Sequence, residues 1–453
     1  MVQKLAFYGF FILLPLPKAP DVDYNVNILI EVIIMKYVKP LICVILCLLC
    51  ITLCCCSEKS ASLTADYTRS GAVPVYDFFS GEEITPENYA KFTPAYMDFA
   101  AELLVASSED ESVVLSPLSL YTALSMTSNG ASGKTLKELE SLLGDDLKTA
   151  DINTYIHYLN SRVQALNNDN GYVKTANSLW LRDSYSVKAQ FLQSIVNYFD
   201  AEVFRTDLAG DGSEKINDWI SNNTDGKIKE LISPLDQDTA MVLVNALLFS
   251  DNWLTPYPES AVTEGTFNGT KGKEPATFMQ SNEMFISSVD AKGIVKNYEN
   301  TPCRFVAILP NENIGIDEYI GSLSGSKLET ILGSASGVNR CEAKLPQFKL
   351  RTNKNLNDTV KSMGAELMFT SEADFGNLTM TDGLYVSDVL QESYIEINTE
   401  GTKAGSASAV VMKDIAAAPQ EFEGLVFDRP FVFMIVENES NLPLFMGAVK
   451  ALG

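Results

Sequence analysis

The sequence predicts a large α+β domain that follows an apolar, cysteine-rich leader. Segments with the apolar spacing of helices alternate with long strand-like runs, a mixture typical of α+β domains. The chain has 453 residues, of which 46% are hydrophobic, so it can bury a large core. Length alone permits two or three domains, but no internal repeat is visible.

Residues 1–56 form the predicted leader, and six of the eight cysteines lie between Cys43 and Cys56. After Met35, the expected true start, two lysines precede an apolar run over residues 41–53, and polar residues follow Cys56. This order is typical of a secretory signal, and the run is shorter than the roughly 20 residues that a membrane span needs. An uncleaved anchor helix is the alternative. Residues 1–34 are expected to have no fold.

The end of this run resembles a bacterial lipobox, because Leu53 lies three positions before Cys56 and small residues lie between them. Cys56 is therefore the predicted lipid-bearing residue, and Cys54 fits less well because bulky Leu53 directly precedes it. The mature protein is expected to be exported and lipid-anchored to the bacterial outer membrane or cell surface. Residues 57–90, rich in Ser, Thr, Asp and Gly, are the predicted tether before a folded domain at 91–453.

The elements of the domain follow from the periodicity of its apolar residues. The third helix ends at Gly144, a common stop signal for a helix. The predicted helices cover residues 96–106, 116–129, 135–143, 187–198, 214–221 and 356–363. The predicted strands cover residues 171–182, 241–249, 303–309, 342–350, 384–397, 431–437 and 444–450.

The charge balance disfavours two classes of partner. Lys and Arg number 34 against 58 Asp and Glu, a net charge of -24. Electrostatic capture of nucleic acid or of an anionic membrane surface is therefore not expected. Basic ligands or proteases would be attracted, although an acidic surface also serves solubility alone.

Catalytic chemistry is scarce in this sequence. His157 is the only histidine and is expected on a helix surface. Its isolation excludes Ser-His and Cys-His catalysis and most zinc sites. No Gly-rich phosphate loop, paired CxxC or acidic calcium loop follows the leader. We therefore expect no enzyme activity, no cofactor and no metal.

A long segment of small residues near the C-terminus is the most informative feature. Residues 394–398 alternate apolar and polar side chains like a half-buried strand, yet the next apolar strand begins only at Phe431. From Thr402 onward no large side chain appears until Val410. Such a loop has nothing to anchor it to a core and nothing to obstruct its entry between two other strands.

Five blocks of sequence resemble the serpin family. They are Leu115–Leu124, Val244–Phe249 with Trp253, the hinge-like run Glu400–Ala409, Phe427–Phe433 and Pro443–Gly447. The resemblance implies a serpin fold with three β-sheets, about eight to nine helices and an exposed C-terminal reactive-centre loop. It also implies one monomeric domain in which Cys303 and Cys341 lie in different regions and stay unpaired.

The resemblance implies inhibition of a serine protease, possibly a cysteine protease, as a suicide substrate. The protease cuts the loop as an acyl-enzyme, and the cut loop inserts into the main sheet as a new strand. Gly401 is expected to supply unusual backbone angles, Thr402 to enter the sheet first and Lys403 to face solvent. The hinge residues are Glu400, Gly401, Thr402, Lys403, Ala404, Gly405, Ser406 and Ala407.

The family's usual spacing from the hinge places the reactive bond at Ile415–Ala416. Counting back from Pro430 places the bond closer to Pro419 instead. The reactive bond is expected within Met412 to Ala418. Apolar residues there suit elastase-like or subtilisin-like proteases, and Lys413 offers trypsin-like proteases a secondary bond.

Two departures from the family pattern concern the opening of the sheet. Gln391 stands where many members have a histidine that bonds to groups matched here by Asn245, Ser116 and Ser119. A glutamine amide both donates and accepts, so it can form this latch without a histidine's pH sensitivity. Trp253 is kept, but Ser250-Asp251-Asn252 replaces the basic residues that usually precede it. A non-inhibitory serpin-fold binding lipoprotein is the alternative function.

Replacing Cys56 with Ser should release the protein from membranes, because the thiol that would carry the lipid is lost. Fractionation of cells into membrane and soluble parts measures the effect, and Cys54→Ser is the matched control that should stay in the membrane. Mass spectrometry that places the lipid on Cys54 would contradict the assignment.

Overall fold

The structure, a computed structural model, describes residues 61–69, 86–144, 147–165, 167–168, 170–403 and 424–452. Residues 60–453 form one compact unit. The predicted leader, with Met35 and Cys56, lies outside the described residues.

The described residues form nine α-helices and fifteen strands, which confirms the predicted α+β class. The helices are α3 (Pro86–Ser107), α4 (Pro117–Gly130), α5 (Gly133–Gly144), α6 (Thr149–Ala165), α7 (Ala189–Tyr198), α8 (Ser213–Asn223), α9 (Ile316–Gly321), α10 (Gly325–Gly333) and α11 (Asn357–Ser362).

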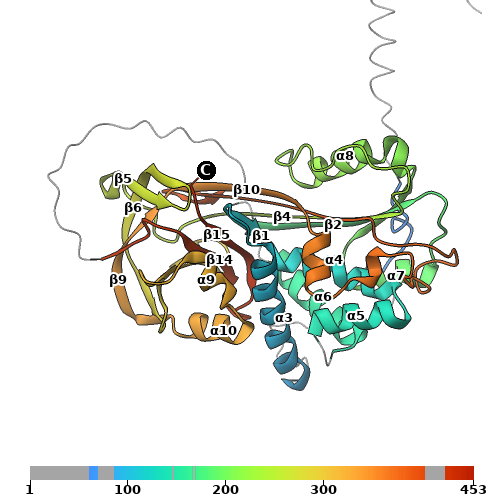
Figure 1. Ribbon diagram of the computed structural model, residues 1–453, viewed down its shortest axis with the longest axis horizontal. Coiled ribbons are helices and arrows are strands. Elements are labelled where there is room, and N and C mark those ends of the chain that lie inside the picture. The colour runs from blue at the N-terminus through green and yellow to red at the C-terminus, as the bar shows by residue number, and fades with distance from the viewer. Residues whose placement is uncertain are drawn as a thin grey trace, which may run out of the picture. The chain divides into compact units, whose positions relative to one another are not determined.

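Six strands form the first sheet, in the order β10-β11-β12-β4-β2-β3. Their bounds are β10 (Phe348–Asn355), β11 (Asp388–Ile397), β12 (Gly401–Lys403), β4 (Met241–Asn252), β2 (Tyr172–Arg182) and β3 (Glu202–Thr206). In Figure 1 this sheet runs along the top, with α4 to α7 beneath one half, the second sheet beneath the other half, and α8 above.

Nine strands form the second sheet, in the order β1-β15-β14-β8-β7-β6-β9-β13, with β5 also paired to β6. Their bounds are β1 (Val113–Leu115), β5 (Val262–Gly269), β6 (Gly272–Ser287), β7 (Ala291–Asn297), β8 (Cys303–Pro310), β9 (Ser336–Pro346), β13 (Leu425–Val426), β14 (Phe431–Glu437) and β15 (Pro443–Val449). Long β6 pairs with β5 over its first half and with β7 over its end, so it joins the second and third expected sheets.

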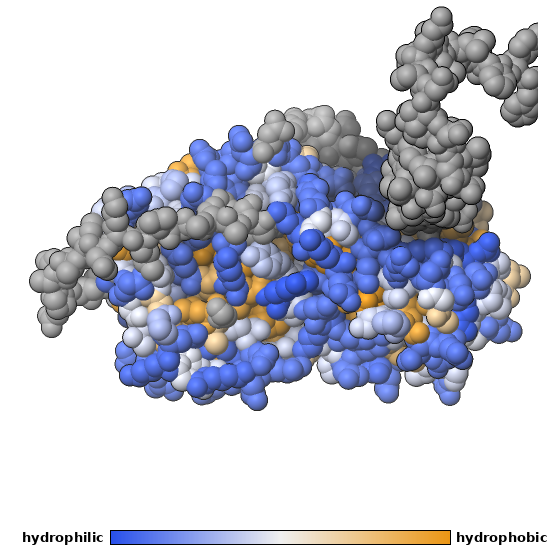
Figure 2. Space-filling model, turned by 90° about the horizontal axis from the view of Figure 1, so that it is seen from above, coloured by the Kyte–Doolittle hydropathy of each residue, from blue (hydrophilic) through white to orange (hydrophobic). Residues whose placement is uncertain are grey.

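The core lies between the two sheets, and a smaller core lies under α8. Nearly every residue of α4 is buried, and the Ser116 hydroxyl caps its first turn by accepting from the Ser119 N–H. On the other face of the first sheet, Trp180 stacks on Phe204 at 4.1 Å. Figure 2 looks down on this face and shows mostly hydrophilic residues with apolar ones between them.

Two predicted boundaries were wrong. The strand predicted at 342–350 is two strands, β9 and β10, which belong to different sheets. Between them the Gln347 N–H donates to the Thr277 carbonyl at 2.8 Å, and the chain there passes from the second sheet to the first. Residues 384–387 precede β11, which begins at Asp388.

Helix α6 was missed because its buried face is partly polar. Asn153, His157 and Asn160 are all buried there, so the face lacks a continuous apolar stripe. The expectation that His157 lies on a helix surface was wrong, since its ring is buried edge-on against Tyr198. Burial, together with the nearby Arg69 charge, lowers the pKa of His157.

The predicted tether contains a segment that packs onto the domain. Residues 61–69 contact strand β3 and helix α7, and α3 already begins at Pro86. The chain therefore joins the folded domain from residue 61 rather than from about residue 91.

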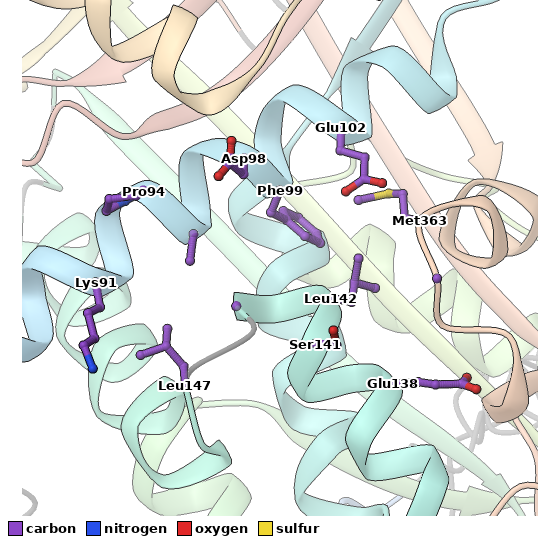
Figure 3. A pocket seen from close by; sticks show the side chains of 13 residues that line it. Lys91, Pro94, Asp98, Phe99, Glu102, Glu138, Ser141, Leu142, Leu147 and Met363 are labelled. Carbon is purple, nitrogen blue, oxygen red and sulfur yellow. The ribbon is translucent and has the colours of Figure 1, made fainter.

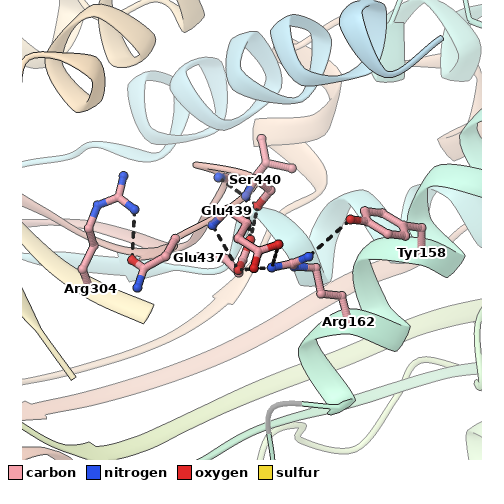
Figure 4. A network of polar contacts seen from close by, with 8 residues as sticks. Tyr158, Arg162, Arg304, Glu437, Glu439 and Ser440 are labelled. Atoms are coloured by element: carbon pink, nitrogen blue, oxygen red, sulfur yellow. Dashed lines mark hydrogen bonds and ion pairs between the residues drawn. The ribbon is translucent and has the colours of Figure 1, made fainter. Parts of the chain in front are cut away.

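A buried ion pair fastens the end of α6 to the turn between β14 and β15 (Figure 4). Arg162 lies 2.9 Å from the Glu437 carboxylate and 2.6 Å from that of Glu439. The other Glu437 oxygen accepts from the Ser440 N–H at 2.7 Å and from its hydroxyl at 2.6 Å. Burial alone raises the pKa of Glu437, but the bonds from Arg162 and Ser440 outweigh it and hold the pKa below its usual value.

Because the folded-state pKa of Glu437 is lowered, its charge stabilises the fold above the usual carboxyl pKa, and this contribution is lost as pH falls. Glu437→Gln should lower the free energy of unfolding by about 2 kcal/mol at neutral pH. The difference from the parent protein should shrink below about pH 4.

Chemical denaturation at both pH values measures this difference. Exposed Glu439→Gln is the matched control and should cost less than about 1 kcal/mol. An equal loss for Glu437→Gln at pH 3 and pH 7 would show that the charge of Glu437 is not what stabilises the turn.

Candidate functional site: the hinge and the sheet opening

The candidate site lies where strands β4 and β11 part. These strands pair in parallel over Asp388–Ser393 and Val242–Leu247. Further along, β12 lies between them and is antiparallel to both. The hinge of the loop has therefore already entered the top of the sheet in the intact chain.

Gly401 is required by close packing. A Cβ atom at this position would lie 2.1 Å from the Asp251 carbonyl oxygen and 2.7 Å from the Asn252 Cα. Such distances are impossible for a side chain without moving β4. Gly401 is not among the glycines with positive φ. The expectation that it supplies unusual backbone angles was therefore wrong, and the need for glycine comes from the neighbouring strand.

Thr402 is completely buried in the sheet. It pairs with Asp251 on β4 and with Ile397 on β11, and its hydroxyl forms a short hydrogen bond with that of Tyr298. Tyr298 in turn stacks on Trp253, with ring centroids 4.7 Å apart. The sequence analysis expected Thr402 to enter the sheet only after cleavage, whereas the structure places it there beforehand.

Trp253 holds the turn that leads into the hinge. Its indole N–H donates to the Asn398 carbonyl at 2.9 Å, and its backbone N–H donates to the Glu400 carbonyl at 2.8 Å. The Asn398 side chain then accepts from the Glu400 and Gly401 N–H groups at 2.9 and 3.1 Å. These bonds fix the hinge in register at the point where it enters the sheet.

The charged residues around Trp253 differ from the family pattern. Asp251, in the stretch where basic residues are usual, accepts from the Thr301 N–H and hydroxyl, each at 2.7 Å. The cation comes instead from Lys296 on β7, whose Nζ lies 5.7 Å from the Trp253 ring and 2.6 Å from the Glu283 carboxylate. Burial lowers the pKa of Lys296 and the Glu283 charge opposes that shift.

Gln391 forms the latch between α4 and the sheet. Its side-chain oxygen accepts from the Ser116 N–H, and its NH₂ group donates to the Ser116 carbonyl, both at 3.0 Å. The same NH₂ group donates to Asn245 at 3.1 Å across the β4–β11 pair. The expected contacts to Asn245 and Ser116 are therefore present. The Ser116 hydroxyl, however, donates to the Leu444 carbonyl instead.

Several buried polar atoms around this latch have no hydrogen-bond partner within the described part of the chain. They are the Ser119 and Ser393 hydroxyls, the Asn245 NH₂ group and the Asn177 side-chain oxygen. Asn177 faces Asn245 in register on β2 and was missed by the sequence analysis. The Asn245 and Ser393 side chains lie along the line where β4 and β11 pair, next to Gln391.

The rest of the hinge and the reactive bond fall outside the described residues. Ala404, Gly405, Ser406 and Ala407 lie there, as do Lys413, Ile415 and Ala416. The chain is described again from residue 424, and β13 pairs with β9. The structure thus places both ends of the loop but does not test its reactive bond.

The remaining candidate features are the two cysteines, groups that could bind a metal, and helices that could span a membrane. Cys303 and Cys341 are both free thiols, as expected. Within the described ranges no group of His, Cys, Asp and Glu residues could hold a metal ion. No helix in the described part of the chain is long and apolar enough to span a membrane.

A pocket of about 480 Å³ lies between α3 and α5, away from the hinge (Figure 3). Two of the three acidic side chains that line it bond to neighbouring backbone. Asp98 accepts from the Gly325 N–H at 2.8 Å, and Glu138 accepts from the Leu367 N–H at 2.8 Å. These contacts give the pocket a structural explanation.

The comparisons with known proteins agree with this geometry. The family model described as "Serpin (serine protease inhibitor)" matches residues 94–451. The chain is 30% identical to rat neuroserpin over 366 residues, which is 76% of this chain and 87% of neuroserpin. It is 29% identical over 352 residues to an uncharacterised serpin-like protein of Thermococcus kodakarensis, with 75% and 81% of the two chains covered. The protein therefore belongs to the serpin family.

Solved structures show the same fold. The native state of tengpin, a thermophilic serpin, matches with a TM-score of 0.77 and 33% identity over 87% of this chain and all of tengpin. The shared fold does not by itself define the function. The complex of thyroxine-binding globulin with thyroxine also matches, with a TM-score of 0.68 and 23% identity over 80% of this chain.

Thr402→Arg should lower the free energy of unfolding of the intact protein by about 3–5 kcal/mol, because it forces an unpaired charge into the sheet. If inhibition proceeds by insertion of the loop, Thr402→Arg should also abolish it, because the same position stays in the sheet during insertion. Thr402→Val is the matched control, which keeps the branched shape and loses only the Tyr298 bond, about 1 kcal/mol.

Thermal unfolding of the uncleaved protein and the stoichiometry of protease inhibition measure the two effects. Unchanged stability of Thr402→Arg would show that the hinge does not occupy the sheet before cleavage.

Proposed function

We propose that this serpin inhibits a protease as a suicide substrate by inserting its reactive-centre loop between β4 and β11. The observation that carries the proposal is the position of β12, which has begun that strand in the intact chain. The protease nucleophile attacks the carbonyl carbon at the reactive bond, the amine of the following residue leaves, and an ester joins enzyme and inhibitor. Insertion of the loop then distorts the protease before water can cleave the ester.

The register of β12 predicts how long the inserted strand would be. Thr402 pairs with Asp251 and Ile397, and nine positions further along both partners lie Val242 and Asp388, which are themselves paired. Continued in this register, Val411 falls opposite both of them. Met412 falls opposite Met241, the first residue of β4. A strand of residues 401–412 thus matches β4 along its whole length, about 40 Å.

The composition of the loop suits this register. Side chains alternate between the two faces of a strand, so even-numbered positions share the core-facing side of Thr402. These positions hold Thr402, Ala404, Ser406, Ser408, Val410 and Met412, none of which is charged. Ser408 falls level with Asn245 and Gln391, where its hydroxyl can reach the polar atoms that the closed sheet leaves unpaired.

The energy for distortion comes from completing the sheet. With about 1 kcal/mol net for each new ladder hydrogen bond, an inserted strand of this length releases on the order of 10 kcal/mol. The short parallel pairing of β4 and β11 is the main interaction that must be given up. Insertion is therefore favourable once cleavage frees the loop.

The proposed reactive bond is Ile415–Ala416, three residues beyond the end of the inserted strand. Elastase-like or subtilisin-like proteases are the preferred targets, and Lys413 is a secondary bond for trypsin-like proteases. We propose further that the protein acts as a monomer at the cell envelope, with a lipid on Cys56 as its anchor. A role as a binding lipoprotein without inhibition is less well supported, because Asp98 and Glu138 of the α3–α5 pocket bond to neighbouring backbone.

Incubation with elastase, subtilisin and trypsin tests the mechanism. The mature protein should form a complex with at least one of them that survives boiling in detergent. Cleavage of the loop without complex by every protease in this panel would favour the binding function instead.

Ile415→Arg should shift inhibition from elastase-like toward trypsin-like proteases by at least tenfold in association rate, because the first specificity pocket accepts the side chain before the cut bond. N-terminal sequencing of the fragment released from an elastase complex should begin at Ala416. Lys413→Ala is the control and should leave elastase inhibition unchanged. A fragment that begins at Gln420 or later would place the bond by its distance from Pro430.

A further inference from the structure

The segment of residues 61–69, termed here the docked segment, is attached to the domain along its length. The Leu63 N–H donates to the Val203 carbonyl of β3 at 2.7 Å, and Thr64 is buried beside Ala201. At its far end Gln193 of α7 donates to the Thr68 carbonyl at 2.8 Å. Arg69 also pairs with Asp200.

The docked segment is held by packing as well as by polar contacts. The Leu63 and Tyr67 side chains are partly buried against the main core. A turn closes the segment on itself, since the Ala65 N–H donates to the Ser62 carbonyl and the Tyr67 N–H to the Thr64 carbonyl. These contacts differ from those of a free linker.

The position of the docked segment limits the distance to the predicted anchor. Ala61 is five positions after Cys56, a length of at most about 17 Å when the chain is fully extended. If the chain were free up to α3, the thirty residues from Cys56 to Pro86 could reach about 100 Å. Attachment of the docked segment therefore decides whether the domain lies within about 17 Å or about 100 Å of the proposed anchor.

The docked segment lies far from the loop along the first sheet. Val203 is level with Leu179 on β2 and Leu243 on β4, eight residues along β4 from Asp251, the partner of Thr402. Eight strand residues span about 26 Å. In Figure 1, α7 and α8 lie at one end of the long axis, and β5 and β9, the partner of β13, lie at the other.

We propose that the docked segment orients the domain on a lipid bilayer, with the β3–α7 end toward the membrane and the loop end toward the medium. This proposal rests on the lipid anchor at Cys56 proposed above. In this orientation a protease in the medium meets the reactive-centre loop first. The register of insertion then carries the trapped protease toward the membrane end of the sheet.

Energy transfer to the bilayer tests the orientation without relying on lipidation in the cell. Residues 56–453 with Cys341→Ser are coupled through Cys56 to vesicles of phosphatidylcholine that contain a maleimide lipid and an acceptor-labelled lipid. A donor dye is placed on α8 or on β5 by replacing exposed Asn222 or exposed Thr263 with p-azidophenylalanine.

The transfer efficiency from position 222 should be at least twice that from position 263. Leu63→Asp, which places a charge against the core, should bring the two efficiencies together, and exposed Asp66→Ala should leave them apart. If Leu63→Asp does not fold, the pair Arg69→Ala and Gln193→Ala removes only surface contacts of the same segment.

Equal efficiencies from the two positions in the parent protein would overturn the proposal. A difference that persists in both undocked variants would also overturn it. Because attachment at position 56 is made chemically, these outcomes are separate from the site of lipidation, which mass spectrometry of the cellular protein tests.

Discussion

The short parallel pairing between β4 and β11 is the constraint on which the rest of the structure depends. It joins the two halves of the first sheet over only six positions, and beyond it the strands diverge to admit β12. A sheet with no such divergence would give the loop no place to enter. Here the space is occupied by β12, so the intact protein already has the start of the strand that the proposed insertion would complete.

Side chains from outside the sheet hold the strands on either side of this divergence. Gln391 bonds to the backbone of Ser116 below, and Trp253 with Tyr298 holds the hinge from the side of the second sheet. Each contact joins segments that are far apart in the chain. Movement of either strand therefore disturbs α4, β7 or the hinge turn, which couples the opening of the sheet to the packing of the whole domain.

The polar contacts near the hinge differ from those in the middle of the first sheet. Asp251 and Lys296 are buried but fully engaged with Thr301 and Glu283, so they resist disruption. Around Gln391, by contrast, several buried polar atoms lack protein partners within the described ranges. Buried charges beside the hinge are thus paired, whereas Gln391, Asn245 and Asn177 place neutral amides in the middle of the sheet.

Motif and composition identified several residues of the candidate site, together with the contacts of Gln391 to Asn245 and Ser116, but not the contacts around Thr402. Gln391, Asn245 and Trp253 lie where the family pattern placed them, and the hinge begins at the expected glycine. The contacts of Lys296 with Trp253 and of Tyr298 with Thr402 could not be predicted, because these residues are far apart in the sequence and no motif links them. Their importance comes from distant strands that meet only in the folded protein.

The sequence by itself determined the α+β class, the small side chains over most of residues 402–409 and the isolation of His157. Those properties are carried by local periodicity and residue type. The tertiary structure alone decided that Thr402 is buried before cleavage, that Gly401 must be glycine because β4 passes so close, and that residues 61–69 belong to the domain. Strand register and the close approach of two strands depend on which segments become neighbours in the fold. A single sequence does not show which segments these are.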